Sequence, residues 1–191
     1  MIAQFFRFIA WWLFNRHTPI TVINDCRCDN ARGRMMTRLA SYFPGVHLEF
    51  IGVKNDVEAA VNLIDTLDAL DIPEENSRSG IIVLNVAPRN GSAKKWPNGT
   101  PFGELTIGRA RIFCTIDGLP LRFLAKMLGR QLSVRVYDIP EIAALLGISL
   151  EVQERTIDSQ YRSFDFLTRL IAARVKGKAL PHTTLNVMPS A

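Results

Sequence analysis

Ile81-Ile82-Val83-Leu84-Asn85-Val86 is a run of large apolar residues broken only by one asparagine. A strand with one face in water alternates apolar and polar side chains, whereas a strand covered on both faces does not. The stretch therefore predicts a central strand of a parallel sheet that has helices packed on both of its faces.

Strand-like and helical segments alternate on both sides of this run. Upstream, strands are predicted at 20–24 and 47–53, and helices at 30–42 and from Asn55 to a stop before Pro73. Downstream, we predict strands at 105–107, 111–116 and 132–137, and helices at 121–128, 140–146 and 166–175. This alternation favours a single α/β domain, with a mostly parallel sheet flanked by helices and joined by right-handed crossovers. We assign residues 19–178 to this domain, 1–18 to an apolar N-terminal helix and 179–191 to a C-terminal tail.

The amino-acid composition indicates which binding partners and which cellular compartment to expect for this protein. The chain has 191 residues and a net charge of +5, with no Lys/Arg block of the length that marks a nucleic-acid-binding tail, so a nucleic-acid partner is not expected. Its three cysteines, an odd number, indicate free thiols in a reducing compartment and hence a cytoplasmic protein. Cys26 and Cys28 lack the spacing of a zinc site, and we predict no metal.

The segment 2–14 is almost wholly apolar, interrupted by Gln4 and Arg7. It is too short to span a bilayer, which takes about 20 residues. Two interpretations remain open. The helix packs on the body of the protein or on a neighbouring subunit, or it lies in a membrane interface with Trp11 and Trp12 on the lipid side. The second interpretation would make the protein a peripheral membrane protein.

Polar residues follow several predicted strands or begin the helices after them: Asp25, Asn30, Asn55, Asp56, Arg89, Asn90 and Asp117. In open α/β sheets, ligands bind outside the carboxyl ends of the strands, so we expect these residues to share one crevice. Most of them also have a local structural explanation. Asn30 and Asn55 are placed to cap helices, and an acid such as Asp56 is favourable in a first helical turn.

Several of these segments, taken in order, resemble a known family. Asn24-Asp25 at a strand end, Asp56-Val57-Glu58-Ala59-Ala60, Pro88-Arg89-Asn90-Gly91 and Asp117-Gly118-Leu119 are similar to motifs of the S-adenosylmethionine hydroxide adenosyltransferases and of their halogenase relatives, the fluorinases and chlorinases. The segment 160–166 also resembles a family segment that precedes a helix. The similarity runs from about residue 20 to residue 178 and covers only the N-terminal domain of the family.

The resemblance implies an adenosine-type small molecule as the partner, with S-adenosylmethionine as substrate or ligand and no other cofactor. Asp25 matches the family aspartate that binds the ribose hydroxyl groups, and Arg89 and Asn90 match the loop near the sugar. Tyr161 and Arg162 fall on another segment that lines the family's pocket. The implied reaction is hydrolysis of S-adenosylmethionine to adenosine and methionine, in a homo-oligomer that the resemblance makes a trimer.

Two departures from the family bear on activity. Arg162 stands where the family has a histidine, and an arginine does not act as a base at neutral pH. The chain also stops near the point where family members continue into a β-barrel domain. The catalytic residues are therefore not assigned. The alternative function is a non-catalytic assembly or membrane-associated module that retains the fold.

Overall fold

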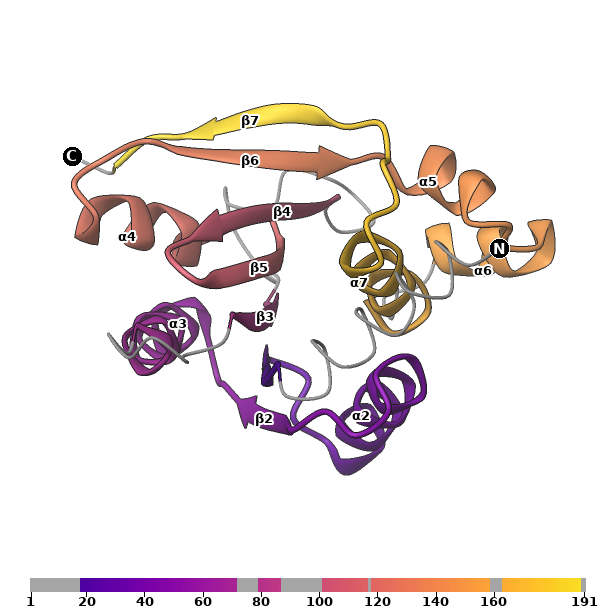
Figure 1. Cartoon of the computed structure of the whole chain (residues 1–191), viewed down its shortest axis with the longest axis horizontal. Helices are drawn as coiled ribbons and strands as arrows, with labels where there is room; N and C mark the ends of the chain where they lie inside the picture. The colour runs from indigo at the N-terminus through magenta and orange to yellow at the C-terminus, as the bar shows by residue number, and fades with distance from the viewer. Residues whose placement is uncertain (1–17, 72–78, 87–100, 117, 159–162, 190–191) are drawn as a thin grey trace, which may run out of the picture.

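The computed structural model describes residues 18–71, 79–86, 101–116, 118–158 and 163–189 (Figure 1). The strands are β1 Ile20–Asn24, β2 Leu48–Gly52, β3 Gly80–Asn85, β4 Phe102–Ile107, β5 Ala110–Thr115, β6 Leu132–Tyr137 and β7 Thr183–Val187. The α-helices are α2 Asp29–Tyr42, α3 Asp56–Leu70, α4 Leu119–Met127, α5 Ile139–Leu145, α6 Leu150–Asp158 and α7 Thr168–Val175, and a π-helical segment, Ser163–Leu167, leads into α7.

All the described strands form a single sheet in the order β2-β1-β3-β5-β4-β6-β7. The predicted α/β domain with one sheet and flanking helices is confirmed. The apolar run that predicted a central strand is β3, which is hydrogen-bonded to β1 on one side and β5 on the other. The predicted N-terminal helix lies outside the described residues.

Parallel pairing is limited to one half of the sheet, which corrects the prediction of a mostly parallel sheet. Strands β2, β1, β3 and β5 are parallel, but β5-β4, β4-β6 and β6-β7 are antiparallel pairs. The physical reason is the length of the β4–β5 connection. Only Gly108 and Arg109 separate these strands, and a two-residue hairpin joins antiparallel strands, whereas a parallel pair needs a long crossover. Gly108 has a φ of 53°, which a glycine adopts without strain.

The helices divide between the two faces of the sheet, so that the apolar core has two layers. Helices α2, α5 and α7 lie on one side, and α3 and α4 lie on the other (Figure 1). On the first side, Met35 and Leu170 pack in one cluster with Val83 of β3. On the second side, Leu63 and Leu124 belong to the cluster that contains Ile82. The alternation of Ile82 and Val83 between two buried layers explains why residues 81–84 are all large and apolar.

The C-terminal segment contributes a strand that the sequence did not predict. Residues 179–191 were expected to form a tail, but Thr183–Val187 is β7, the edge strand paired with β6. Helix α6 was also not predicted from the sequence. Within the part of the chain that is described, no helix has the length and apolar character needed to cross a membrane.

Candidate functional site at the carboxyl ends of β1 and β3

The chain reverses its direction of travel across the sheet between β1 and β3. From β1 it passes through α2 to β2 on one side, and then through α3 back across to β3 on the other side. Helices α2 and α3 consequently cover opposite faces (Figure 1). A position of this kind is a topological switch point, and it is where open α/β sheets bind ligands, outside the carboxyl ends of the strands.

Two asparagines meet at this switch point. Asn24 ends β1 and Asn85 ends β3, and the two are register partners across the parallel pair. Asn24 is completely buried. Its side-chain Oδ1 accepts hydrogen bonds from the backbone N–H of Cys26 at 2.9 Å and from Nδ2 of Asn85 at 3.1 Å. These two donors fix the orientation of the Asn24 amide, because rotating it by 180° would place its own NH2 group against them.

That orientation leaves a buried donor without a partner. Among the described residues, Nδ2 of Asn24 is the buried side-chain nitrogen or oxygen that has no hydrogen bond. A buried polar group left unsatisfied costs roughly 1–3 kcal/mol, and such groups are few in native proteins. The Asn24 amide is oriented by two hydrogen bonds to its oxygen, and its nitrogen makes none within the described part of the chain. This nitrogen is therefore a candidate hydrogen-bond donor to a ligand.

Asp25 follows Asn24 and is partly exposed. Its backbone N–H donates to the carbonyl oxygen of Asn85 at 3.3 Å, and the backbone carbonyl of Asn24 accepts from Val53 N–H at 2.9 Å. These backbone bonds continue the parallel pairing past the strand ends and hold Asp25 beside the asparagine pair. The switch point thus combines an acceptor-only carboxylate with an amide donor, a set that suits a ligand carrying hydroxyl groups and a hydrogen-bond acceptor.

The predicted segments around Asp56 and Gly118 do come together. Oδ2 of Asp56, in the first turn of α3, accepts from the backbone N–H of Leu119 at 3.4 Å, at the start of α4. Gly118 has a φ of 104°, and a Cβ on it would lie 2.9 Å from the same Asp56 oxygen. A glycine is required there on both grounds. Asp56 therefore joins the N-terminal ends of α3 and α4, which is a structural role in the described part of the chain.

The other predicted residues divide into helix-terminal and undescribed positions. Oδ1 of Asn55 accepts from Glu58 N–H at 2.9 Å, so its predicted capping role is confirmed. Asn30 does not cap α2, which corrects the prediction. The helix begins at Asp29 with Cys28 as its N-cap, and Asn30 is an exposed residue of its first turn. Arg89, Asn90, Asp117, Tyr161 and Arg162 lie outside the described residues.

Asn24 and Asn85 were not predicted as site residues. Each is a single amide at the last position of a largely apolar strand, and that pattern was the available signal. The pairing itself depends on the register between β1 and β3, which are separated by two crossovers.

Cys114, near the carboxyl end of β5, is not suited to act as a nucleophile. Burial raises the pKa of the Cys114 thiol, on β5, to about 12, and its Sγ lies 3.8 Å from the carbonyl oxygen of Gly103. A thiol with that pKa stays protonated at neutral pH. In the described ranges, no group of three His, Cys, Asp or Glu side chains is placed to hold a metal ion.

Comparison with known proteins identifies the fold but no family. No protein-family model matches the chain, and no curated protein matches it. The crystal structure of an uncharacterized conserved protein from Thermotoga maritima superposes with a TM-score of 0.55 at 11% sequence identity. The match covers 90% of this chain and 62% of the Thermotoga chain, so this chain spans less than two thirds of its neighbour's length. At this identity the likeness concerns the fold alone.

Proposed function

We propose that this protein binds an adenosine-type ligand, S-adenosylmethionine or its adenosine product, at the carboxyl ends of β1 and β3. The observation that carries the proposal is the buried, unpaired Nδ2 of Asn24 next to the partly exposed carboxylate of Asp25, both at the topological switch point of the sheet. The resemblance to the S-adenosylmethionine hydroxide adenosyltransferases supports the choice of ligand, because Asp25 matches the ribose-binding aspartate of that family.

In this proposal the residues at the switch point hold the ligand. Asp25 accepts hydrogen bonds from the ribose hydroxyl groups, and Asn24 donates one to an acceptor atom of the same ligand. Because Nδ2 of Asn24 is buried, a ligand reaches it only when the atoms that cover it move aside. The first contact is therefore assigned to Asp25, and Asn24 completes the site once the ligand is seated.

The reaction implied by the resemblance is displacement of methionine from S-adenosylmethionine by water. No charged general base is assigned, and the acceleration available to such a site comes from positioning the substrate and excluding bulk water around the nucleophile. Slow hydrolysis is therefore expected, with binding as the property to measure first.

The test is isothermal titration calorimetry of the full chain with adenosine and with S-adenosylmethionine, followed by chromatography of the products. Asp25→Asn keeps the shape of the side chain, removes its charge and replaces one acceptor by a donor. Loss of a charge-assisted hydrogen bond costs roughly 1.5–3 kcal/mol, so we expect affinity to fall about 10- to 100-fold.

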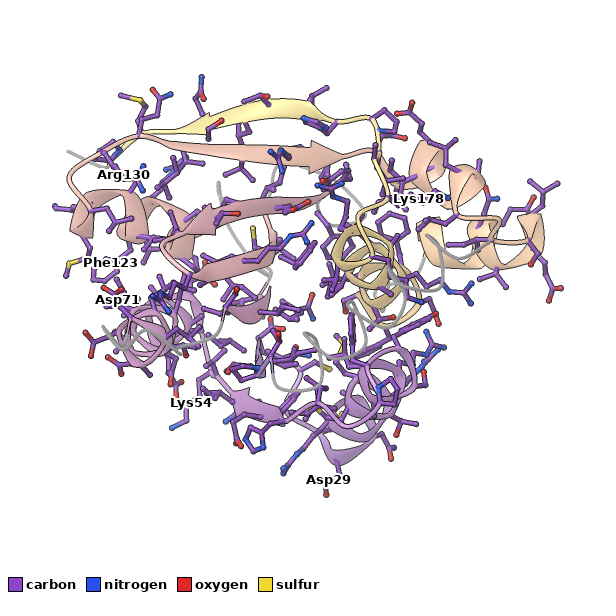
Figure 2. The ribbon with its side chains drawn as sticks, viewed as in Figure 1. Asp29, Lys54, Asp71, Phe123, Arg130 and Lys178 are labelled. Carbon is purple, nitrogen blue, oxygen red and sulfur yellow. The ribbon has the colours of Figure 1, made fainter. Side chains whose placement is uncertain are left out.

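Asp71→Asn is the matched control. Asp71 is an exposed residue at the opposite end of α3 from Asp56, and the substitution removes the same charge far from the switch point (Figure 2). We expect this variant to bind as the wild type does. Equal binding by wild type and Asp25→Asn, or no binding by either, would reject the proposal and favour the assembly-module alternative.

A further inference from the structure

A cluster of charged side chains lies on the antiparallel half of the sheet, away from the β1–β3 switch point. The carboxylate of Glu104, on β4, is surrounded by three guanidinium groups from three different elements. These are Arg111 of β5, Arg135 of β6 and Arg174 of α7. The side chain of Glu104 is only 2% exposed, so the cluster has one buried anion at its centre.

Both carboxylate oxygens of Glu104 accept hydrogen bonds from residues other than Arg135. Its Oε1 accepts from Nε of Arg111 at 2.7 Å, and its Oε2 accepts from Nε of Arg174 at 2.7 Å and from the Tyr137 hydroxyl at 2.5 Å. Burial favours the protonated carboxyl, but the hydrogen bonds from Arg174 and Tyr137 and the charge of Arg111 outweigh it and lower the pKa of Glu104. The group is therefore ionised at neutral pH, and one negative charge faces three positive charges.

Arg135 is the member of the cluster whose donors are not used. Its nearest contact is an NH1 to Oε1 distance of 3.7 Å, which is too long for a hydrogen bond, and that oxygen is already held by Arg111. In the described part of the chain, no hydrogen bond from the Arg135 guanidinium is found, and its side chain is 52% exposed. A planar fork of N–H donors thus lies near two other guanidinium groups and is open to solvent.

The surface around Arg135 is polar and offers further hydrogen-bonding groups. Arg135 pairs with Thr184 of β7, and Ser133, two residues earlier on β6, pairs with Asn186. Side chains two residues apart on a strand share a face, so these residues lie on the same face as Arg135, and all of them are exposed. Strands β6 and β7 form the edge of the sheet (Figure 1).

We propose that Arg135, with Arg111 and Arg174 beside it, forms a phosphate-binding site on the open face of β6 and β7. Counting the described residues alone, three arginines and one glutamate leave the cluster with two positive charges in excess, which match the charge of a phosphate dianion. The guanidinium fork pairs with two phosphate oxygens, and the neighbouring hydroxyl and amide groups of Ser133, Thr184 and Asn186 supply additional donors. Inorganic phosphate and a phosphomonoester present this same chemistry. The site is separate from the β1–β3 switch point and does not depend on the function proposed there.

The experiment is titration of the full chain with inorganic phosphate and, in a second arm, with glycerol 3-phosphate, each followed by calorimetry. Ionic strength is held constant with sodium chloride, because surface electrostatics weaken as salt rises. We expect saturable binding in at least one arm, and the tighter arm identifies the source of the phosphate group. Arg135→Gln should weaken that binding by roughly tenfold, the loss of one charge-assisted contact at a half-exposed position.

Two further variants make the result decisive. Arg130→Gln removes an equal charge from an exposed arginine in the turn between α4 and β6 and should bind as the wild type does (Figure 2). Arg135→Lys keeps the charge but loses the planar fork, so an intermediate affinity is expected. Far-ultraviolet circular dichroism verifies that each variant is folded. The absence of saturable binding by the wild type in both arms, or equal weakening in Arg135→Gln and Arg130→Gln, would overturn the proposal.

Discussion

Replacing Glu104 with glutamine removes a buried anion that joins β4 to β5 and α7 through ion pairs. Glutamine has nearly the same shape, but it offers one acceptor oxygen where the carboxylate offers two. Its NH2 group must then face either the Arg111 side or the side occupied by Arg174 and Tyr137, all of which are donors. The variant therefore loses hydrogen bonds and leaves three guanidinium groups without their counterion.

The size of the effect follows from the burial of the partners. Removing one member of a buried ion pair costs about 3–5 kcal/mol. Glu104 is 2% exposed, but Arg174 and Arg111 are 15% and 26% exposed, so water screens part of the remaining repulsion and the low end of that range applies. A loss of about 3 kcal/mol lowers the melting temperature of a domain of this size by roughly 6–12 °C.

The assay is thermal and urea unfolding of wild type and Glu104→Gln, with Glu49→Gln as the control. Glu49 is an exposed residue of β2, and its substitution should change stability by less than about 0.5 kcal/mol. If Glu104→Gln is as stable as Glu49→Gln, the buried Glu104 carboxylate does not stabilise the fold through its arginine partners.

The stability difference between wild type and Glu104→Gln should also depend on pH, and the pKa of Glu104 sets the direction of the change. The pKa of Glu104 in the folded protein lies below the ordinary value of 4.5 for a glutamate, so the stabilisation by its charge is complete above the unfolded-state pKa. It is lost as the pH falls through the lower, folded-state value. The stability difference between wild type and Glu104→Gln should therefore be constant near neutral pH and shrink only below about pH 4.5. A difference that changes between pH 6 and pH 8 would contradict the assignment to this carboxyl group.

Three further predictions concern other parts of the fold. Gly118→Ala should destabilise the protein by about 1–3 kcal/mol in urea unfolding, because its φ of 104° is unfavourable for alanine and the added Cβ would lie 2.9 Å from Asp56 Oδ2. If this variant unfolds at the same urea concentration as the wild type, the backbone at Gly118 does not lie as close to Asp56 as the structure shows. Asn55→Ala should cost about 1 kcal/mol in the same assay through loss of the α3 cap, and no change would count against the capping bond. Exposed Cys28 should react with a thiol reagent in the native protein, whereas buried Cys114 should react only on unfolding, and equal rates measured by mass spectrometry would contradict that burial.

The elements that are determined by residues close together in the sequence, such as β3 and the start of α3, could be predicted from the sequence. Residues 81–84 of β3 are all large and apolar because both faces of the strand are buried, and that pattern alone predicted the central strand. Asn55 three residues before Glu58 predicted the start of α3 because a capping bond is made within one turn. The direction of β4 was decided by the two-residue turn at Gly108 and Arg109, whose hairpin geometry was not recognised in the sequence.

The candidate site was only partly predictable for a different reason. The position of Asp25 after a strand could be seen in the sequence, but the partner of Asn24 is set by the register of two strands that are far apart along the chain. Likewise, the arginines around Glu104 come from β5, β6 and α7, and no local spacing joins them. Residues brought together by long-range pairing carry no periodic signal, so the asparagine pair and the arginine cluster emerged only from the structure.

A crystal structure of the full chain in complex with adenosine tests the central proposal most directly. We expect the ribose to lie at the carboxyl ends of β1 and β3, with its hydroxyl groups within hydrogen-bonding distance of the Asp25 carboxylate and an acceptor atom of the ligand bound to Nδ2 of Asn24. Adenosine bound elsewhere on the molecule, or crystals grown at saturating adenosine with none at the switch point, would contradict it.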